Sequence, residues 1–134
     1  MPVLKSDVLP IRSSSDVVVV RQLVRTRAIE AAFSLVDQTR IVTAASELAR
    51  NTLDYGGGGQ ARIEIVNEGP RTGLRMTFED TGPGIADVEL ALQDGYTTGR
   101  GLGLGLGGAR RLMNEFGIES KRGEGTRVVA VRWH

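Results

Sequence analysis

The first pattern along the chain is a helical recurrence of apolar residues that begins at Val17. From there, apolar side chains return at intervals of three or four residues, at Val20, Leu23, Val24, Ala28, Ala31 and Ala32. The four valines at 17–20 would also suit a strand, but the pattern continues with alanines past Arg27, which favours a helix. Asp16 is the predicted N-cap of this helix, and residues 8–13 before it form a candidate strand.

A second helical stripe runs from Asp37, its predicted N-cap, to about Tyr55. Four glycines at 56–59 follow, and they end the helix because glycine readily adopts the backbone conformations that terminate helices. The predicted buried stripe consists of Ile41, Ala44, Ala45, Leu48, Thr52 and Tyr55.

Two hairpins are predicted where short apolar runs flank turn residues. Residues 61–67 and 74–79 flank the turn-rich segment 68–73, which makes part of the sheet antiparallel. Residues 118–121 and 127–133 form a second hairpin around 122–125.

Two further helices are predicted in the segment between the two hairpins, one near its start and one near its end. Residues 86–93 are a candidate short helix, 94–104 are expected to be mobile, and 107–116 form a third main helix. Its apolar face consists of Ala109, Leu112, Met113 and Phe116. The fold class is therefore an α/β (α+β) two-layer sandwich, with three main helices on one face of a mixed sheet of four to five strands.

Composition narrows the functional classes. A length of 134 residues predicts a single domain over residues 1–134. Its 17 basic and 16 acidic residues are balanced, so neither a nucleic-acid nor a membrane partner is expected. The absence of cysteine excludes disulfides and thiolate chemistry, and the single histidine is His134. No run resembles a signal peptide or a membrane span, so we expect a cytoplasmic protein.

Glu47 and Asn51 are candidates for phosphate chemistry. They lie four residues apart, on one face of the second helix. Mg²⁺ prefers oxygen ligands and keeps several waters, so a single amide oxygen from the protein suffices. A carboxylate beside it could take a proton from an attacking hydroxyl. For this spacing alone, an ordinary solvated helix face is the favoured interpretation.

Asp80 follows a predicted strand and begins a turn that contains Gly82 and Gly84. The glycines leave room for a flat ligand, and the carboxylate could accept the exocyclic amine of adenine. The alternative is a plain turn, because aspartate and glycine are common turn residues.

The glycine-rich run from 99 to 108 matches the dinucleotide-binding fingerprint at Gly103, Gly105 and Gly108. No strand directly precedes it, so that assignment fails, and no Gly-Lys-Ser/Thr is present for a Walker loop. A glycine-rich lid that leads into a helix N-terminus remains, where backbone amides favour phosphate. Thr97 and Thr98 would add hydroxyl donors. A flexible linker is the alternative, but leucines alternate with the glycines.

Taken in order, these motifs resemble those of the GHKL (Bergerat-fold) ATPase/kinase superfamily. The matching residues are Glu47 and Asn51, then Asp80, Gly82 and Gly84, then Gly101, Gly103 and Gly105, and finally Gly123, Gly125 and Thr126. Stretches 46–51, 94–98 and 111–116 are similar to the RsbT-type serine/threonine switch kinases. This likeness extends from about Val17 to Trp133.

The resemblance implies a site for ATP or ADP with Mg²⁺. Asn51 would be the metal ligand and Glu47 the catalytic base. Asp80 would recognise adenine, with support from Thr126 through water. The remaining implied nucleotide-binding residues are Gly82, Gly84, Ile85, Thr97, Thr98, Gly101, Gly103, Leu104 and Gly105.

The resemblance also implies a role in signalling. Such kinases phosphorylate a serine or threonine on STAS-domain scaffold and antagonist proteins of the stressosome and, once released, activate a PP2C-type phosphatase. The main alternative is an anti-sigma factor, which shares these motifs and binds a sigma factor. Simple ATPases of the gyrase or chaperone type need further domains, and histidine kinases need a phosphoacceptor-histidine helix pair. Neither feature is found in this sequence.

Overall fold

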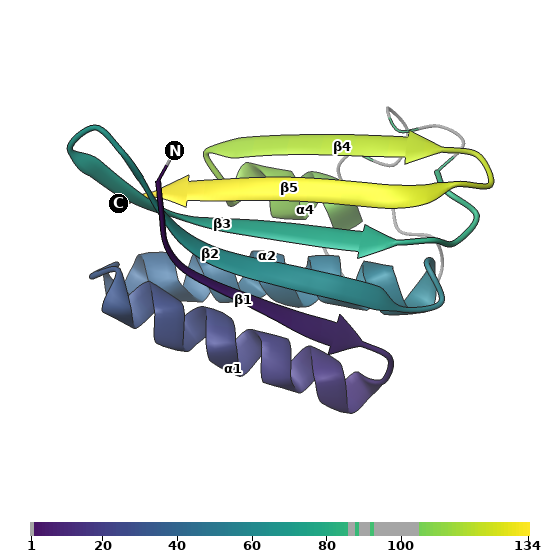
Figure 1. Ribbon diagram of the computed structural model, residues 1–134, viewed down its shortest axis with the longest axis horizontal. Helices are drawn as coiled ribbons and strands as arrows, with labels where there is room; N and C mark the ends of the chain where they lie inside the picture. Colours follow the sequence, from purple (N-terminus) through teal and green to yellow (C-terminus); the bar gives the residue numbers. More distant parts are fainter. Residues whose placement is uncertain (1, 86–87, 89–91, 93–104) are drawn as a thin grey trace.

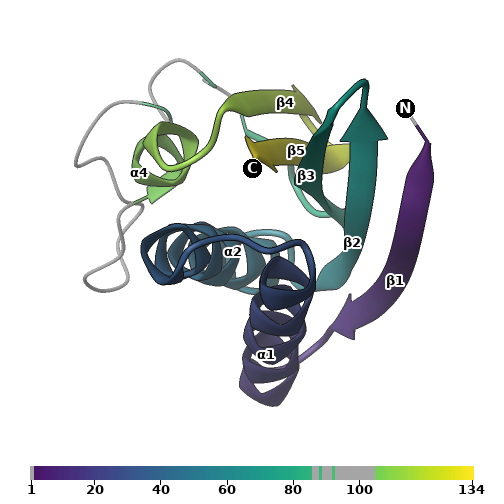
Figure 2. The same ribbon diagram turned by 90° about the vertical axis from the view of Figure 1, so that its left-hand side faces the viewer.

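The computed structural model describes residues 2–85, 88, 92 and 105–134. Figures 1 and 2 show a curved sheet with its helices on one face. The elements are β1 (Val3–Ile11), α1 (Ser14–Glu30), α2 (Leu35–Asp54), β2 (Gly59–Glu68), β3 (Arg71–Asp80), α4 (Gly105–Arg111), β4 (Glu115–Lys121) and β5 (Gly125–Trp133). The predicted two-layer α+β class is confirmed.

The sheet has five strands in the order β1-β2-β3-β5-β4, and every neighbouring pair is antiparallel. The expectation of a mixed sheet is therefore wrong in this detail. β1, β3 and β4 run in one direction, but β2 and β5 lie between them, so no two strands of the same direction are paired (Figure 1). Both predicted hairpins are confirmed, as β2–β3 and β4–β5.

The core lies between the inner face of the sheet and the apolar stripes of the helices. Both stripes predicted from the sequence are buried where they face the sheet, and they pack on strand residues such as Ile63, Met76 and Phe78. Two residues of the predicted stripes are exceptions. Tyr55 lies at the C-cap of α2 and is 42% exposed. Ala32 lies beyond the end of α1, with a φ of +65°, and is exposed. Within the described residues, no helix is long and apolar enough to cross a membrane.

Both long helices begin earlier than predicted, because serines cap them. The Ser13 hydroxyl accepts the amide of Asp16 at 3.4 Å, and the Ser34 hydroxyl accepts that of Asp37 at 3.1 Å. The two aspartates are therefore not N-caps. They lie in the first turn, where a negative charge is favourable near the positive end of the helix dipole.

The helix α4 ends before the predicted limit. The amide of Asn114 donates to the carbonyl of Val131 at 2.8 Å, so the chain has already turned toward β5 at that point. Phe116 consequently lies in β4, from which it packs against the core, whereas Ala109 and Met113 are buried as expected. Most of the predicted short helix at 86–93 and the whole segment 94–104 lie outside the described residues.

Candidate functional site

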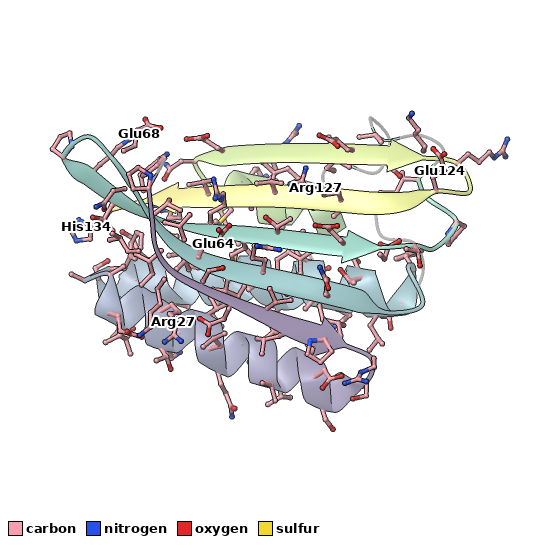
Figure 3. All side chains as sticks on the ribbon, in the orientation of Figure 1. Arg27, Glu64, Glu68, Glu124, Arg127 and His134 are labelled. Carbon is pink, nitrogen blue, oxygen red and sulfur yellow. The ribbon has the colours of Figure 1, made fainter. Side chains whose placement is uncertain are left out.

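One end of the sheet brings several of the predicted motifs together. There, Gly59 pairs with Asp80, Asp80 with Thr126, and Thr126 with Ser120. Residues directly opposite each other in an antiparallel ladder project from the same face. The row continues on β1 to Ile11, which is fully buried in the core, so its side chains project from the helix-covered face. This end lies on the right in Figure 1, and Figure 3 labels Glu124 beside it.

The carboxylate of Asp80 is fixed by its own turn. Oδ1 accepts the amide of Gly82 at 2.9 Å. In the described part of the chain, Oδ2 makes no hydrogen bond, and the residue is half-buried. The side chain is thus oriented with one acceptor oxygen free for a donor group on a ligand.

Glycines surround Asp80 at distances that no larger residue allows. A Cβ on Gly56 would lie 2.3 Å from both Cβ and Cγ of Asp80, and one on Gly82 would lie 2.7 Å from Cα of Gly56. A Cβ on Gly125 would lie 2.1 Å from the Asp80 carbonyl oxygen. Glycine is therefore required at Gly56 and Gly125 by contact with Asp80, and at Gly82 by contact with Gly56.

Gly84 approaches the end of β4 in the same way. Its φ is +77°, and a Cβ there would lie 2.3 Å from the carbonyl oxygen of Lys121. The motif glycines Gly82 and Gly84 thus allow close approach of backbone segments to one another. Sequence reasoning assigned the run 56–59 only to ending α2 and missed the contact between Gly56 and Asp80. The signal was the length of that run, since a helix end needs only one glycine.

Ser120 is a second site residue that sequence reasoning missed. Its hydroxyl accepts the amide of Ile85 at 2.7 Å, and its oxygen lies 2.9 Å from Oγ1 of Thr126 and 3.2 Å from the carbonyl oxygen of Gly125. It therefore links the turn after Asp80 to the start of β5. Nothing in its local sequence distinguishes it from an ordinary strand serine.

Glu47 and Asn51 lie on α2, half-buried and one turn apart. Oε1 of Glu47 accepts the amide of Gly105, the first residue of α4, at 2.9 Å. The φ of Gly105 is +71°, a conformation that favours glycine. The glycine-rich run 99–108 therefore contacts the predicted base through Gly105.

The side-chain amide of Asn51 has no hydrogen-bond partner among the residues that the structure describes. Its backbone carbonyl accepts the amides of Tyr55 at 2.9 Å and Gly56 at 3.4 Å. Since Gly56 packs on Asp80, backbone contacts connect the two polar groups of the site.

The described residues contain no group of three or more histidine, cysteine, aspartate or glutamate side chains that could hold a metal alone. An uncommitted amide oxygen instead fits a Mg²⁺ whose other ligands come from phosphate and water. Of the predicted site residues, Thr97, Thr98, Gly101, Gly103 and Leu104 lie outside the described part of the chain.

The model of the family of histidine kinase-, DNA gyrase B- and HSP90-like ATPases matches residues 36–133. The chain belongs to this ATPase family. The matched segment contains every described residue of the site, from Glu47 on α2 to Thr126 on β5.

Curated relatives place the chain within the family. It is 50% identical over 118 residues to the serine/threonine-protein kinase RsbT of Bacillus subtilis, which covers 88% of this chain and 89% of the relative. It is 33% identical over 106 residues to the anti-sigma F factor of Anoxybacillus flavithermus, covering 74% and 71% of the two chains. The anti-sigma F factor of Clostridium kluyveri is 30% identical over 102 residues, with coverage of 72% and 70%.

A solved structure supports the fold. The crystal structure of the RsbU and RsbW domains of a Mycobacterium tuberculosis protein matches with a TM-score of 0.65 and 20% identity. The match covers 98% of this chain and 32% of the other. The predicted superfamily, the likeness to RsbT-type kinases and the serine/threonine-protein kinase class are confirmed, and an ATPase domain of this kind binds nucleotide.

Proposed function

We propose that this chain is an ATP- and Mg²⁺-dependent kinase that phosphorylates a serine or threonine of STAS-domain proteins in a partner-switching stress pathway. The observation that carries the proposal is the position of Glu47, which accepts the Gly105 amide one turn from Asn51, whose side-chain amide has no partner among the described residues. The 50% identity to RsbT, over most of both chains, favours a kinase over the anti-sigma factors at 30–33%.

We assign Asp80 to the adenine base and Asn51 to Mg²⁺. Among the described residues, Oδ2 of Asp80 has no hydrogen-bond partner and is available for the exocyclic amine, and Gly56 and Gly82 add no side chain next to it. Asn51 offers a neutral oxygen, the ligand type that Mg²⁺ takes beside phosphate. We also assign nucleotide contacts to Gly84, Ile85, Gly105 and Thr126, and to Thr97, Thr98, Gly101, Gly103 and Leu104 outside the described residues.

When bound, ATP would supply the phosphoryl group, and Mg²⁺ would offset the negative charge of the phosphate oxygens. Glu47 then accepts the proton of the substrate hydroxyl. Its Oε1 is held by Gly105, so Oε2 is the oxygen that remains for that proton. Phosphoryl transfer asks little covalent chemistry of a protein, so positioning carries most of the rate enhancement.

The partners we propose are STAS-domain scaffold and antagonist proteins, and a PP2C-type phosphatase that the chain activates after release. The name RsbT belongs to a curated relative that is similar over 89% of its length, which supports a shared pathway. A sigma factor is the partner in the alternative function, which the names of the two anti-sigma F factors favour.

The kinase assignment is tested with labelled ATP, Mg²⁺ and candidate STAS proteins. Glu47→Gln keeps an oxygen that can accept the Gly105 amide but lacks the basic carboxylate, so we expect ADP binding to persist and transfer to fall by about a hundredfold or more. Asp80→Asn keeps the Gly82 contact and removes the charge, so we expect weaker ADP binding.

Glu119→Gln is the matched control, because this exposed glutamate on β4 projects from the opposite face of the sheet to the site row. It should leave both ADP binding and transfer unchanged. Full phosphotransfer by the Glu47→Gln protein would contradict the assignment of the base.

A further inference from the structure

We propose that an exposed stripe on the N-terminal half of α2 is the docking surface for the protein substrate, where Arg40 pairs with a carboxylate of the STAS-domain protein. The proposal rests on the function proposed above and adds the place at which the substrate binds. The stripe, called the α2 stripe below, consists of Leu35, Val36, Thr39, Arg40 and Thr43.

The order of the site groups along α2 gives the side from which the substrate arrives. Gly56, just beyond the C-cap of α2, packs on Asp80, which we assign to adenine. Asn51, assigned to Mg²⁺, comes next, and the proposed base Glu47 lies one turn further toward the N-terminus of the helix. The nucleotide would therefore extend along α2 from its base to its γ-phosphate in this direction.

The acceptor hydroxyl continues the same line. In phosphoryl transfer, the attacking and leaving oxygens lie roughly in line on opposite sides of the phosphorus. The hydroxyl must therefore approach from the side of the γ-phosphate that faces away from ADP. Along α2, this is the side of Glu47 toward the helix N-terminus, where the α2 stripe lies.

The α2 stripe is continuous with the proposed base. Val36, Arg40, Thr43 and Glu47 follow one another at intervals of three or four residues, so they share one face of the helix. The helical rise places Arg40 about 10 Å and Val36 about 16 Å from Glu47 along the axis. α2 packs between α1 and α4 (Figure 2), yet this face stays exposed at Val36, Arg40 and Thr43. One folded domain can span these distances while its hydroxyl lies at Glu47.

Most of the α2 stripe offers apolar contact. Leu35 is 71% exposed and Val36 is 60% exposed. The hydroxyl of Thr39 donates to the carbonyl of Leu35 at 3.0 Å, and that of Thr43 donates to the carbonyl of Thr39 at 2.8 Å. Both hydroxyl hydrogens are therefore used within the helix, so the threonines offer a partner no donor.

Arg40 is the one cation of the α2 stripe, and its pairing within the chain is weak. Its side chain is 51% exposed and lies 3.4 Å from Oδ1 of Asp37. The same oxygen accepts a hydrogen bond from Arg132 at 3.0 Å. A carboxylate on a partner can therefore bind the Arg40 guanidinium and leave Asp37 paired with Arg132. The partner surface that fits is apolar, with an acidic residue about 10 Å from the acceptor hydroxyl.

The experiment measures initial rates of phosphorylation of a STAS-domain antagonist protein by the full chain, with labelled ATP and Mg²⁺ at saturation. We expect Arg40→Glu to lower kcat/KM for the STAS protein by about tenfold, with a larger effect at low ionic strength. Val36→Ser should lower it by about threefold, because less apolar surface is buried on docking. The change should lie in KM rather than kcat, because docking is distinct from the transfer step. ADP affinity, measured by calorimetric titration, should be unchanged in both variants.

Arg62→Glu and Val8→Ser are the matched controls. Val8 and Arg62 pair across β1 and β2, and both are exposed. Ala61 and Ile63 on either side of Arg62 are fully buried in the core, so Arg62 and Val8 project from the face of the sheet opposite the helices. Both controls should leave kcat/KM and ADP affinity unchanged.

Charge reversal on the substrate tests the pairing directly. Acidic residues on the STAS surface around its acceptor hydroxyl are replaced by arginine, one at a time. One of these substrates should be poorer for the unmodified chain and should regain most of the lost kcat/KM with Arg40→Glu. The comparison with the unmodified chain needs no variant of this protein, so it holds even if Arg40→Glu folds poorly.

Equal kcat/KM for Arg40→Glu and the unmodified chain, or restoration by none of the reversed substrates, would overturn the docking surface and leave the proposed kinase function intact. A dimer of this chain that Arg40→Glu dissociates, seen by sedimentation, would assign the α2 stripe to a second copy and also overturn the proposal. Failure of the unmodified chain to phosphorylate any STAS protein would instead overturn the proposed function itself.

Discussion

At the scale of single residues, Gly56 limits what the site can tolerate. A Cβ on this residue would lie 2.3 Å from Cβ and Cγ of Asp80, so one of the two residues must shift, and a shift of Asp80 disturbs its 2.9 Å bond from Gly82. We therefore expect Gly56→Ala to displace the carboxylate and weaken ADP binding by at least about tenfold, the equivalent of one hydrogen bond. Isothermal titration with ADP measures the change.

Gly117→Ala is the matched control for this substitution. Gly117 lies in β4, and a Cβ there would meet nothing within 4 Å. Its ADP affinity should equal that of the unmodified chain. Unchanged affinity in Gly56→Ala as well would show that Asp80 is not the residue that recognises the base.

The sequence predicted single residues correctly where their contacts lie within one turn of the chain. The turn of Asp80 and Gly82 follows from turn propensities, and the bond between them lies within that turn. Gly56 and Ser120 were missed because their partners come from other strands and turns. Such contacts depend on the register in which the strands pair, and the local order of apolar, polar and turn residues does not specify that register.

At the scale of elements, a group of ion pairs joins the edge strand β1 to α1. Lys5 donates to Glu30 at 2.7 Å, and Arg27 bonds both Glu30, at 2.5 Å, and Asp7, at 2.9 Å. Figure 3 labels Arg27 on α1 next to β1. The hydrogen bonds from Lys5 and then Arg27 lower the pKa of Glu30, and the contact with Asp7 raises the pKa of Arg27.

The lowered pKa of Glu30 gives stability a dependence on pH. The folded chain holds the carboxylate ionised to lower pH than the unfolded chain does, so this contribution is present above the unfolded pKa and is lost as pH falls through the folded pKa. We expect the free energy of unfolding to fall less steeply with acid in Glu30→Gln than in the unmodified chain. Urea unfolding at neutral and acid pH measures this slope.

Glu124→Gln, in the exposed turn between β4 and β5, controls for removal of a surface carboxylate and should retain the original slope. Identical acid slopes for Glu30→Gln and the unmodified chain would mean that the pKa of Glu30 is the same in the folded and unfolded chains, which would contradict the prediction.

The sequence predicted the long helices correctly from their apolar stripes, but it misplaced the residues at which helices begin and end. The apolar stripes predicted both long helices because burial follows periodicity. The N-caps were assigned to Asp16 and Asp37 because aspartate is also a favoured cap, although serines three residues earlier cap both helices. The end of α4 depends on a bond from Asn114 to β5, a tertiary contact that helical spacing does not reveal.

At the scale of the whole molecule, the topology assembles the site from distant segments. The ends of α2, β3 and β4 meet the beginnings of β2 and β5 at one end of the sheet (Figure 1). The predicted fold class and the order of motifs follow from sequence, since each motif could be placed on an element. The uniformly antiparallel pairing does not, because strand order depends on how β5 is placed between β3 and β4.

The protein that this chain binds distinguishes the two functions that the relatives suggest, a STAS-directed kinase and an anti-sigma factor. The immobilised full chain with ADP and Mg²⁺ is offered, separately, a STAS-domain antagonist, a PP2C-type phosphatase and a sigma factor. We expect retention of the first two and not of the sigma factor, because similarity to RsbT is higher and covers more of the chain than similarity to the anti-sigma F factors.

The Glu47→Gln variant separates binding of a partner from its phosphorylation. Its side chain acts on the transferred proton and retains an oxygen for Gly105, so the variant should still retain the STAS protein while it fails to phosphorylate it with labelled ATP. The sigma factor needs no phosphotransfer for its capture, so an anti-sigma function would show equal sigma retention by the unmodified and Glu47→Gln chains. That outcome, with no STAS phosphorylation by the unmodified chain, would replace the kinase assignment by the anti-sigma one.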